Sequence, residues 1–134
     1  MKLAERILII LIALEHLCFL VLEMFLFTTP TGLHTFGTTQ EFANAAATLA
    51  ANQGLYNGFL VAGLLWGAAA KSPVVALHFK TFFLLCVFLA GSYGAWTLGK
   101  SSIFFLQGLP ALIALVLVQA SSRRDQDPEG IVNR

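Results

Sequence analysis

The stretch KSPVVALHFKTFFLLCVFLAGSYGAWTLGK, residues 71–100, decides the fold of this chain. Between its two terminal lysines the stretch contains one Asp, Glu, Lys or Arg residue, which is Lys80. About 20 helical residues cross the roughly 30 Å hydrocarbon layer of a bilayer. Ser72 is a suitable N-cap and Pro73 a favoured first helical residue, so we predict a membrane-spanning helix from Pro73 to about Leu98.

Similar stretches lie on both sides of this one. Residues 42–70 and 101–122 contain no Asp, Glu, Lys or Arg, and Leu3 to Phe27 is mostly apolar. The whole chain has 134 residues, of which 57% are hydrophobic and 11% charged, whereas a soluble domain carries about 25% charged residues. We therefore predict an all-α polytopic membrane protein, a four-helix transmembrane bundle that occupies residues 1–120 as one domain.

The first apolar segment has a competing interpretation as a secretory signal peptide. Basic residues precede an apolar run, as such a peptide requires. However, Glu15 and His16 interrupt the run, and no cleavage site of small residues follows it. A first span from Leu3 to Phe27 is the better interpretation.

The first connection, from Thr28 to Thr39, contains proline and glycine and is predicted to be a loop. Thr38, with Glu41 three residues later, forms a candidate capping box, which predicts that a helix begins near Gln40. A helix from Gln40 to Ala70 would be about 46 Å long, which exceeds the bilayer thickness.

Part of that long helix should therefore lie outside the hydrocarbon. We expect Gln40–Ala51 to form a short interfacial helix in the first loop. The second span would be Asn52–Ala70, with a break at Gly54.

The last span is expected from Ile103 to about Ala120, with a kink at Pro110. Residues 121–134 are polar and are predicted to form a disordered cytoplasmic tail. Lysine and arginine residues concentrate in the loops on one side of the predicted bundle, so both termini should be cytoplasmic. These residues are Lys2, Arg6, Lys71, Arg123 and Arg124. The net charge of +1 argues against nucleic acid as a partner.

Four sequence blocks carry a resemblance to a known family. They are LVLEMFLFTTP (20–30), ANQGLYNGFLVAGLLW (51–66), AGSYGAWT (90–97) and QGLPALIAL (107–115). These blocks resemble the small bacterial integral membrane proteins grouped as the domain of unknown function 1304 family, and the likeness extends from about Leu3 to Leu117. The resemblance implies a compact multi-span protein of the bacterial cytoplasmic (inner) membrane. It implies no reaction, and His78 and Lys80 are not part of the family pattern.

Three ionisable residues share one face of the first span: Glu15, His16 and Glu23. Charged groups inside a membrane are costly and usually functional. We predict them as catalytic candidates, with Glu15 or Glu23 as acid or base and His16 as a proton partner. The alternative is a hydrogen-bonded network that fixes helix packing.

The second span carries a polar face within two turns, made of Asn52, Gln53, Tyr56 and Asn57. Their donors and acceptors suit either a polar ligand group or the carboxylates of the first span. Gln107 on the last span is a further candidate ligand residue, with a packing role as the alternative.

Other features have a structural explanation. The pairs Gly54–Gly58 and Gly63–Gly67 are G-x-x-x-G motifs, which allow close helix approach. Cys18 and Cys86 fit inert thiols better than a disulfide or a reactive site. No pair of His, Cys or acidic residues has a recognised metal-ligand spacing, so we predict no metal and no cofactor.

Three functions remain open. The first is a site that binds or transforms a small lipophilic molecule, the second a proton-coupled transporter that uses Glu15, and the third an assembly subunit of a membrane complex. The bilayer is the expected partner in each case, and self-association into a homo-oligomer is compatible with all three.

Overall fold

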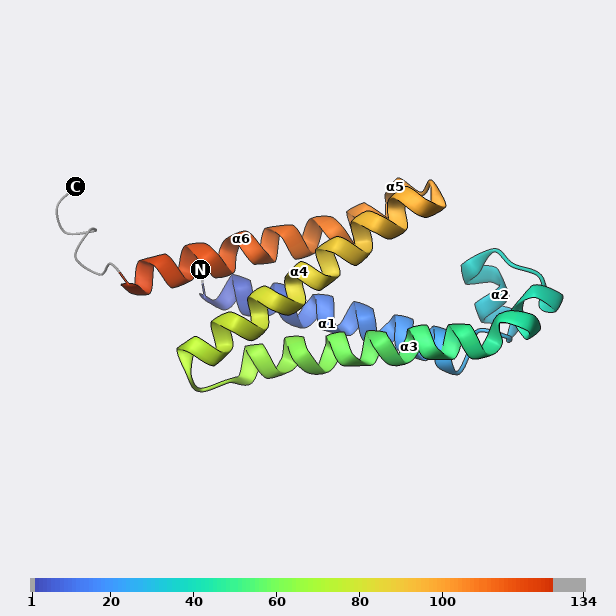
Figure 1. Ribbon diagram of the computed structural model, residues 1–134, viewed down its shortest axis with the longest axis horizontal. Helices are drawn as coiled ribbons and strands as arrows, with labels where there is room; N and C mark the ends of the chain where they lie inside the picture. Colours follow the sequence, from blue (N-terminus) through green and yellow to red (C-terminus); the bar gives the residue numbers. More distant parts are fainter. Residues whose placement is uncertain (1, 127–134) are drawn as a thin grey trace. The chain divides into compact units, whose positions relative to one another are not determined.

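The computed structural model describes residues 2–126, all of whose regular elements are helical (Figure 1). The elements are α1 (Lys2–Met24), α2 (Pro30–Phe36), α3 (Gln40–Ala69), α4 (Pro73–Leu98), α5 (Ser101–Ile103), the π-helix η1 (Phe104–Gly108) and α6 (Leu109–Gln126). Within the described residues, three helices are long and apolar enough to cross a membrane: Lys2–Met24, Pro73–Leu98 and Ser101–Asp125. With the long α3, they are consistent with the predicted four-helix polytopic bundle, and the all-α membrane fold is confirmed.

Helix α4 begins with the cap that the sequence indicated and ends with a glycine cap. The Ser72 hydroxyl accepts a hydrogen bond from the Val75 N–H (3.5 Å), and Pro73 occupies the first turn. The helix ends at Gly99, whose φ of 62° is left-handed and costs glycine little. The predicted bounds, Pro73 and Leu98, are confirmed.

The first connection contains a short helix, α2, where the sequence predicted a loop. Thr29 caps α2 by accepting a hydrogen bond from the Gly32 N–H (3.4 Å), and Pro30 follows at the first helical position. Gly37 ends the helix with a φ of 64°. A capping residue followed by proline therefore begins α2, as it begins α4. Pro30 and Gly37, which suggested a loop, mark the start and the end of this helix.

The structure corrects the prediction for the segment from Gln40. Helix α3 begins at Gln40 as expected, but Thr39 rather than Thr38 accepts the capping hydrogen bond, from the Phe42 N–H (3.2 Å). The helix runs without a break through Gly54, so Gln40–Ala51 is not a separate helix. A glycine inside a helix costs only about 1 kcal/mol. The short helix of the first loop is α2.

The last span contains one irregular turn. The Leu109 N–H donates to the Phe104 carbonyl, five residues back, where a regular α-helix would use the residue four back. This π turn directly precedes Pro110, which lacks an N–H donor and disturbs the preceding turn. The irregularity expected at Pro110 thus takes the form of η1.

Helix α6 also extends beyond the predicted end of the span. It continues to Gln126, so the first part of the predicted disordered tail is helical. Arg123 and Arg124 lie in its last turn, where positive charge interacts favourably with the helix dipole. The remaining tail residues, 127–134, lie outside the described residues.

The described chain forms two compact units, and the single domain expected for residues 1–120 stays a prediction. Unit 1 is Met1–Ile12 with Gly63–Arg134, and unit 2 is Ala13–Ala62. In unit 1, α4 packs against η1 and α6. The closest approach is at Gly91, where a Cβ atom would lie 2.6 Å from the Gly108 backbone nitrogen.

The G-x-x-x-G pairs of α3 serve different neighbours. In unit 2, a Cβ on Gly54 would lie 2.5 Å from Met24 Cγ of α1. In unit 1, a Cβ on Gly63 would overlap the Phe83 ring of α4, and one on Gly67 would lie 3.0 Å from the Lys80 backbone nitrogen. Both pairs therefore allow close helix packing, as the motif predicts.

Candidate functional site in unit 2

A hydrogen bond joins the end of α1 to α3 inside unit 2. The Asn57 Nδ2 donates to Glu23 Oε2 at 2.8 Å and makes a longer contact of 3.3 Å with the Gln53 carbonyl of its own helix. Both side chains are half-buried. The sequence left open whether the amides of α3 face a ligand or the carboxylates of the first span. At Asn57 the contact with a carboxylate is present.

Glycine at position 54 makes this contact feasible. A Cβ there would lie 3.1 Å from both Glu23 Cβ and the Leu20 carbonyl oxygen. Such distances are tighter than ordinary packing contacts. The absence of a side chain on Gly54 therefore lets α1 and α3 approach until the Asn57 amide reaches Glu23.

Glu15 and His16 have different environments although they are neighbours. The His16 ring is 1% exposed and lies edge-on to the Phe19 ring, with 5.8 Å between centroids. Glu15 projects about 100° away around the helix and is half-buried. Among residues 2–126, its carboxylate makes no hydrogen bond or ion pair.

The remaining predicted residues of α3 do not converge on Glu23. Asn52, Gln53 and Tyr56 are exposed, and the Tyr56 ring, 55% exposed, contacts Phe59 of its own helix at 6.1 Å. Their shared polar face is present, but only Asn57, at its edge, reaches α1. Most of the polar face of α3 is therefore exposed and is not covered by α1.

Gln107 belongs to unit 1, not to this site. It lies in η1 and is half-buried. A Cβ on Gly91 would be 3.0 Å from Gln107 Cβ, so this residue borders the closest α4 contact. Both interpretations of Gln107, as a ligand residue and as a packing residue, stay predictions.

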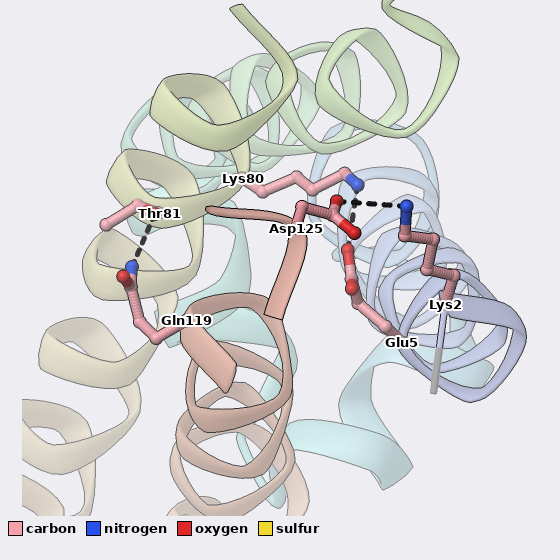
Figure 2. A network of polar contacts seen from close by, with 6 residues as sticks. All are labelled: Lys2, Glu5, Lys80, Thr81, Gln119 and Asp125. Atoms are coloured by element: carbon pink, nitrogen blue, oxygen red, sulfur yellow. Dashed lines mark hydrogen bonds and ion pairs between the residues drawn. The ribbon is translucent and has the colours of Figure 1, made fainter. Parts of the chain in front are cut away.

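A second polar cluster, in unit 1, was missed from the sequence (Figure 2). Lys80 Nζ of α4 lies 2.8 Å from Glu5 Oε1 of α1, and these side chains are 18% and 5% exposed. Gln119 Nε2 of α6 donates to Thr81 Oγ1 at 2.9 Å. A single lysine inside an apolar span needs a partner, and that signal could have identified the Glu5–Lys80 pair.

The cysteines and the metal-ligand residue types form no centre in the described part of the chain. Cys18 is exposed and Cys86 half-buried, and both are free thiols. No group of three His, Cys, Asp or Glu side chains within residues 2–126 could hold a metal ion. The polar groups of the candidate residues in unit 2 are carboxyl, imidazole, amide and phenol groups.

The helices and their polar contacts define a small polytopic membrane protein. The chain belongs to the family described as "Protein of unknown function (DUF1304)", which matches residues 10–119. It is similar to "Uncharacterized protein YpaA" of Lactococcus lactis subsp. lactis (strain IL1403), with 31% identity over 118 residues that cover 87% of this chain and 97% of the relative. No solved structure matches the chain.

Proposed function

We propose that unit 2 binds a small lipophilic molecule with a polar head, which enters from the membrane between α1 and α3. The Glu23–Asn57 hydrogen bond at 2.8 Å carries the proposal. It holds an acid and an amide at a helix crossing where both remain partly accessible. A ligand hydroxyl or carbonyl can exchange hydrogen bonds with this pair without leaving a buried polar group unpaired.

The other residues of unit 2 have proposed roles around this pair. Asn52, Gln53 and Tyr56 extend the polar face of α3 and would orient the ligand head. Glu15 and His16 lie about two turns before Glu23 on α1. If the protein is an enzyme, they would act on the ligand, with a carboxyl group as acid or base and the imidazole as its proton partner. Gln107, in the other unit, stays a separate prediction.

The test is mass spectrometry of small molecules that co-purify in mild detergent. We expect a compound enriched in the wild type and depleted at least about tenfold in Glu23→Gln and Asn57→Ala. The first variant removes the carboxyl group and the second removes the amide that binds it. The matched controls are Glu41→Gln and Asn44→Ala, which change the same residue types at exposed positions of α3. They should retain the compound.

Equal recovery from all five proteins would contradict the binding proposal. Depletion by the two controls as well would also contradict it, because the effect would then not depend on the Glu23–Asn57 pair.

One observation favours proton-coupled transport as a second candidate function. The Glu15 carboxylate lies midway along α1 without a hydrogen bond or ion pair to the described residues, as an exchanging group requires. It would bind a proton and a lipophilic cation in turn. In proteoliposomes with an imposed pH gradient, Glu15→Gln should abolish cation flux and Glu41→Gln should retain it.

The two candidates are separable by these variants. Loss of a co-purifying compound in Glu23→Gln with no proton-linked flux favours binding or catalysis. Flux that depends on Glu15 and not on Glu23 favours transport.

A further inference from the structure

Charged residues gather at the end of unit 1 where α1 and α4 begin and α6 ends. Lys2 Nζ lies 2.9 Å from Asp125 Oδ2, which joins the start of α1 to the end of α6 (Figure 2). Glu5 pairs with Lys80 of α4 at 2.8 Å. Each described acidic group at this end is therefore already held in an ion pair.

Four cations at the same end have no such partner among the described residues. We call them the basic end: Arg6, Lys71, Arg123 and Arg124. All four are exposed. The extension of α6 to Gln126 holds two of them on a helix, at a fixed distance from the apolar segment that precedes them.

Helix stability does not explain this arrangement. Arg123 and Arg124 suit the negative end of the α6 dipole. Arg6 and Lys71, however, gain nothing from a helix dipole, because Arg6 lies in the second turn of α1 and Lys71 directly precedes the cap of α4.

We propose that the basic end binds the headgroups of anionic phospholipids. Helical segments long and apolar enough to span a membrane adjoin it on α1, α4 and α6. In a bilayer these spans would bring the four cations to the level of the lipid phosphates. A phosphatidylglycerol headgroup carries a net negative charge, whereas phosphatidylcholine is neutral overall. Juxtamembrane clusters of four or more Lys or Arg residues favour the former.

The experiment is native mass spectrometry of the full-length protein, titrated with phosphatidylglycerol or phosphatidylcholine of identical acyl chains. The wild type should bind phosphatidylglycerol more tightly. Removal of one cation, in Arg6→Gln or Lys71→Gln, should weaken that binding about fivefold, and the fourfold variant that also includes Arg123→Gln and Arg124→Gln should lose the preference. Asp127 and Glu129 stay unchanged throughout.

The matched control is Lys100→Gln, an exposed lysine in the turn before α5. It should keep the wild-type preference. Circular dichroism establishes whether each variant is folded. If the fourfold variant does not fold, the single variants test the proposal. The proposal is overturned if the folded single variants bind both lipids as the wild type does, or if Lys100→Gln loses the preference equally.

Soluble glycerol 3-phosphate provides the remaining comparison. It offers the same phosphate chemistry without acyl chains. Binding of glycerol 3-phosphate as tight as that of the phospholipid would show a phosphate site rather than a membrane-surface contact, and would contradict the proposal. Weak, salt-sensitive binding of glycerol 3-phosphate is the expected result.

Discussion

Lys80 Nζ lies 2.8 Å from Glu5 Oε1, although the two residues are 75 positions apart in the chain. The lysine stem also passes close to α3, since a Cβ on Gly67 would lie 3.0 Å from Lys80 Cγ. Three helices of unit 1 therefore meet at this pair. An ammonium group among apolar helices is tolerated because a carboxylate compensates its charge at hydrogen-bond distance.

Removal of one partner should be costly. Glu5→Gln leaves the Lys80 ammonium without its counter-ion, and we expect a loss of about 3 to 5 kcal/mol in the free energy of unfolding. The measurement is denaturant or thermal unfolding in detergent micelles, followed by circular dichroism. The double variant Glu5→Leu with Lys80→Met should recover most of the loss because it removes both charges together.

Lys2→Gln is the control for this prediction. It removes the Lys2–Asp125 ion pair, whose side chains are 74% and 55% exposed, and should change stability by less than about 1 kcal/mol. Equal effects of Glu5→Gln and Lys2→Gln would mean that the Glu5–Lys80 pair is as solvated as the surface pair.

The contact between Gly91 and η1 predicts a difference between two glycines of α4. In Gly91→Ala the new methyl group would meet the Gly108 backbone nitrogen at 2.6 Å, and we expect a loss of about 1 to 3 kcal/mol. In Gly94→Ala the nearest atom would be 3.5 Å away, an ordinary contact, so stability should be unchanged or slightly higher. Unfolding curves of both variants in the same detergent measure the difference. Equal destabilisation would contradict the packing described for α4 and η1.

The successes and failures of sequence reasoning follow from how local each signal is. Ser72 and Pro73 act on their own helix end, and they located the start of α4 correctly. Thr29 and Pro30 carry the same local signal, which was missed because α2 is only seven residues long and shows no apolar period. The predicted break at Gly54 was wrong because a single glycine costs a helix only about 1 kcal/mol. The contact of α1 at Gly54 is not visible in the sequence of α3.

The site shows the same division. Helical spacing placed Asn52, Gln53, Tyr56 and Asn57 on one face, but it could not say which of them contacts α1. That depends on the close approach at Gly54. Long-range pairs such as Glu5 with Lys80 depend on how helices distant in the chain pack together, and only the rule that a buried charge needs a partner points to them.

The Glu23–Asn57 hydrogen bond should be measurable as a coupling energy. A double-mutant cycle with Glu23→Ala and Asn57→Ala should give a coupling of about 0.5 to 2 kcal/mol, the range of hydrogen bonds between membrane helices. The same cycle with Glu41→Ala in place of Glu23→Ala should give a value near zero, because Glu41 lies about four turns from Asn57 on α3. No coupling in the first cycle would mean that the bond contributes nothing to the packing of α1 and α3.

The expected orientation, with both termini cytoplasmic, depends on whether α3 crosses the membrane. Helices α1, α4 and α5–α6 are long and apolar enough to span a membrane. Helix α3 is long enough, but it is not among the helices that are apolar enough. If α3 lay along the surface, three spans would place the two ends of the chain on opposite sides. If α3 crosses, four spans return the C-terminal end to the side of the N-terminus.

Phosphatase fusions distinguish these arrangements, since the enzyme is active only outside the cytoplasm. We expect activity after Gly32 and after Lys100, and none after Lys71 or Gln126, because cytoplasmic loops carry the excess of lysine and arginine. The fusion after Lys71 decides the question: it shares the side of Gly32 only if α3 does not cross. Activity there, together with inactivity after Lys100, would require three spans and would overturn the four-span topology.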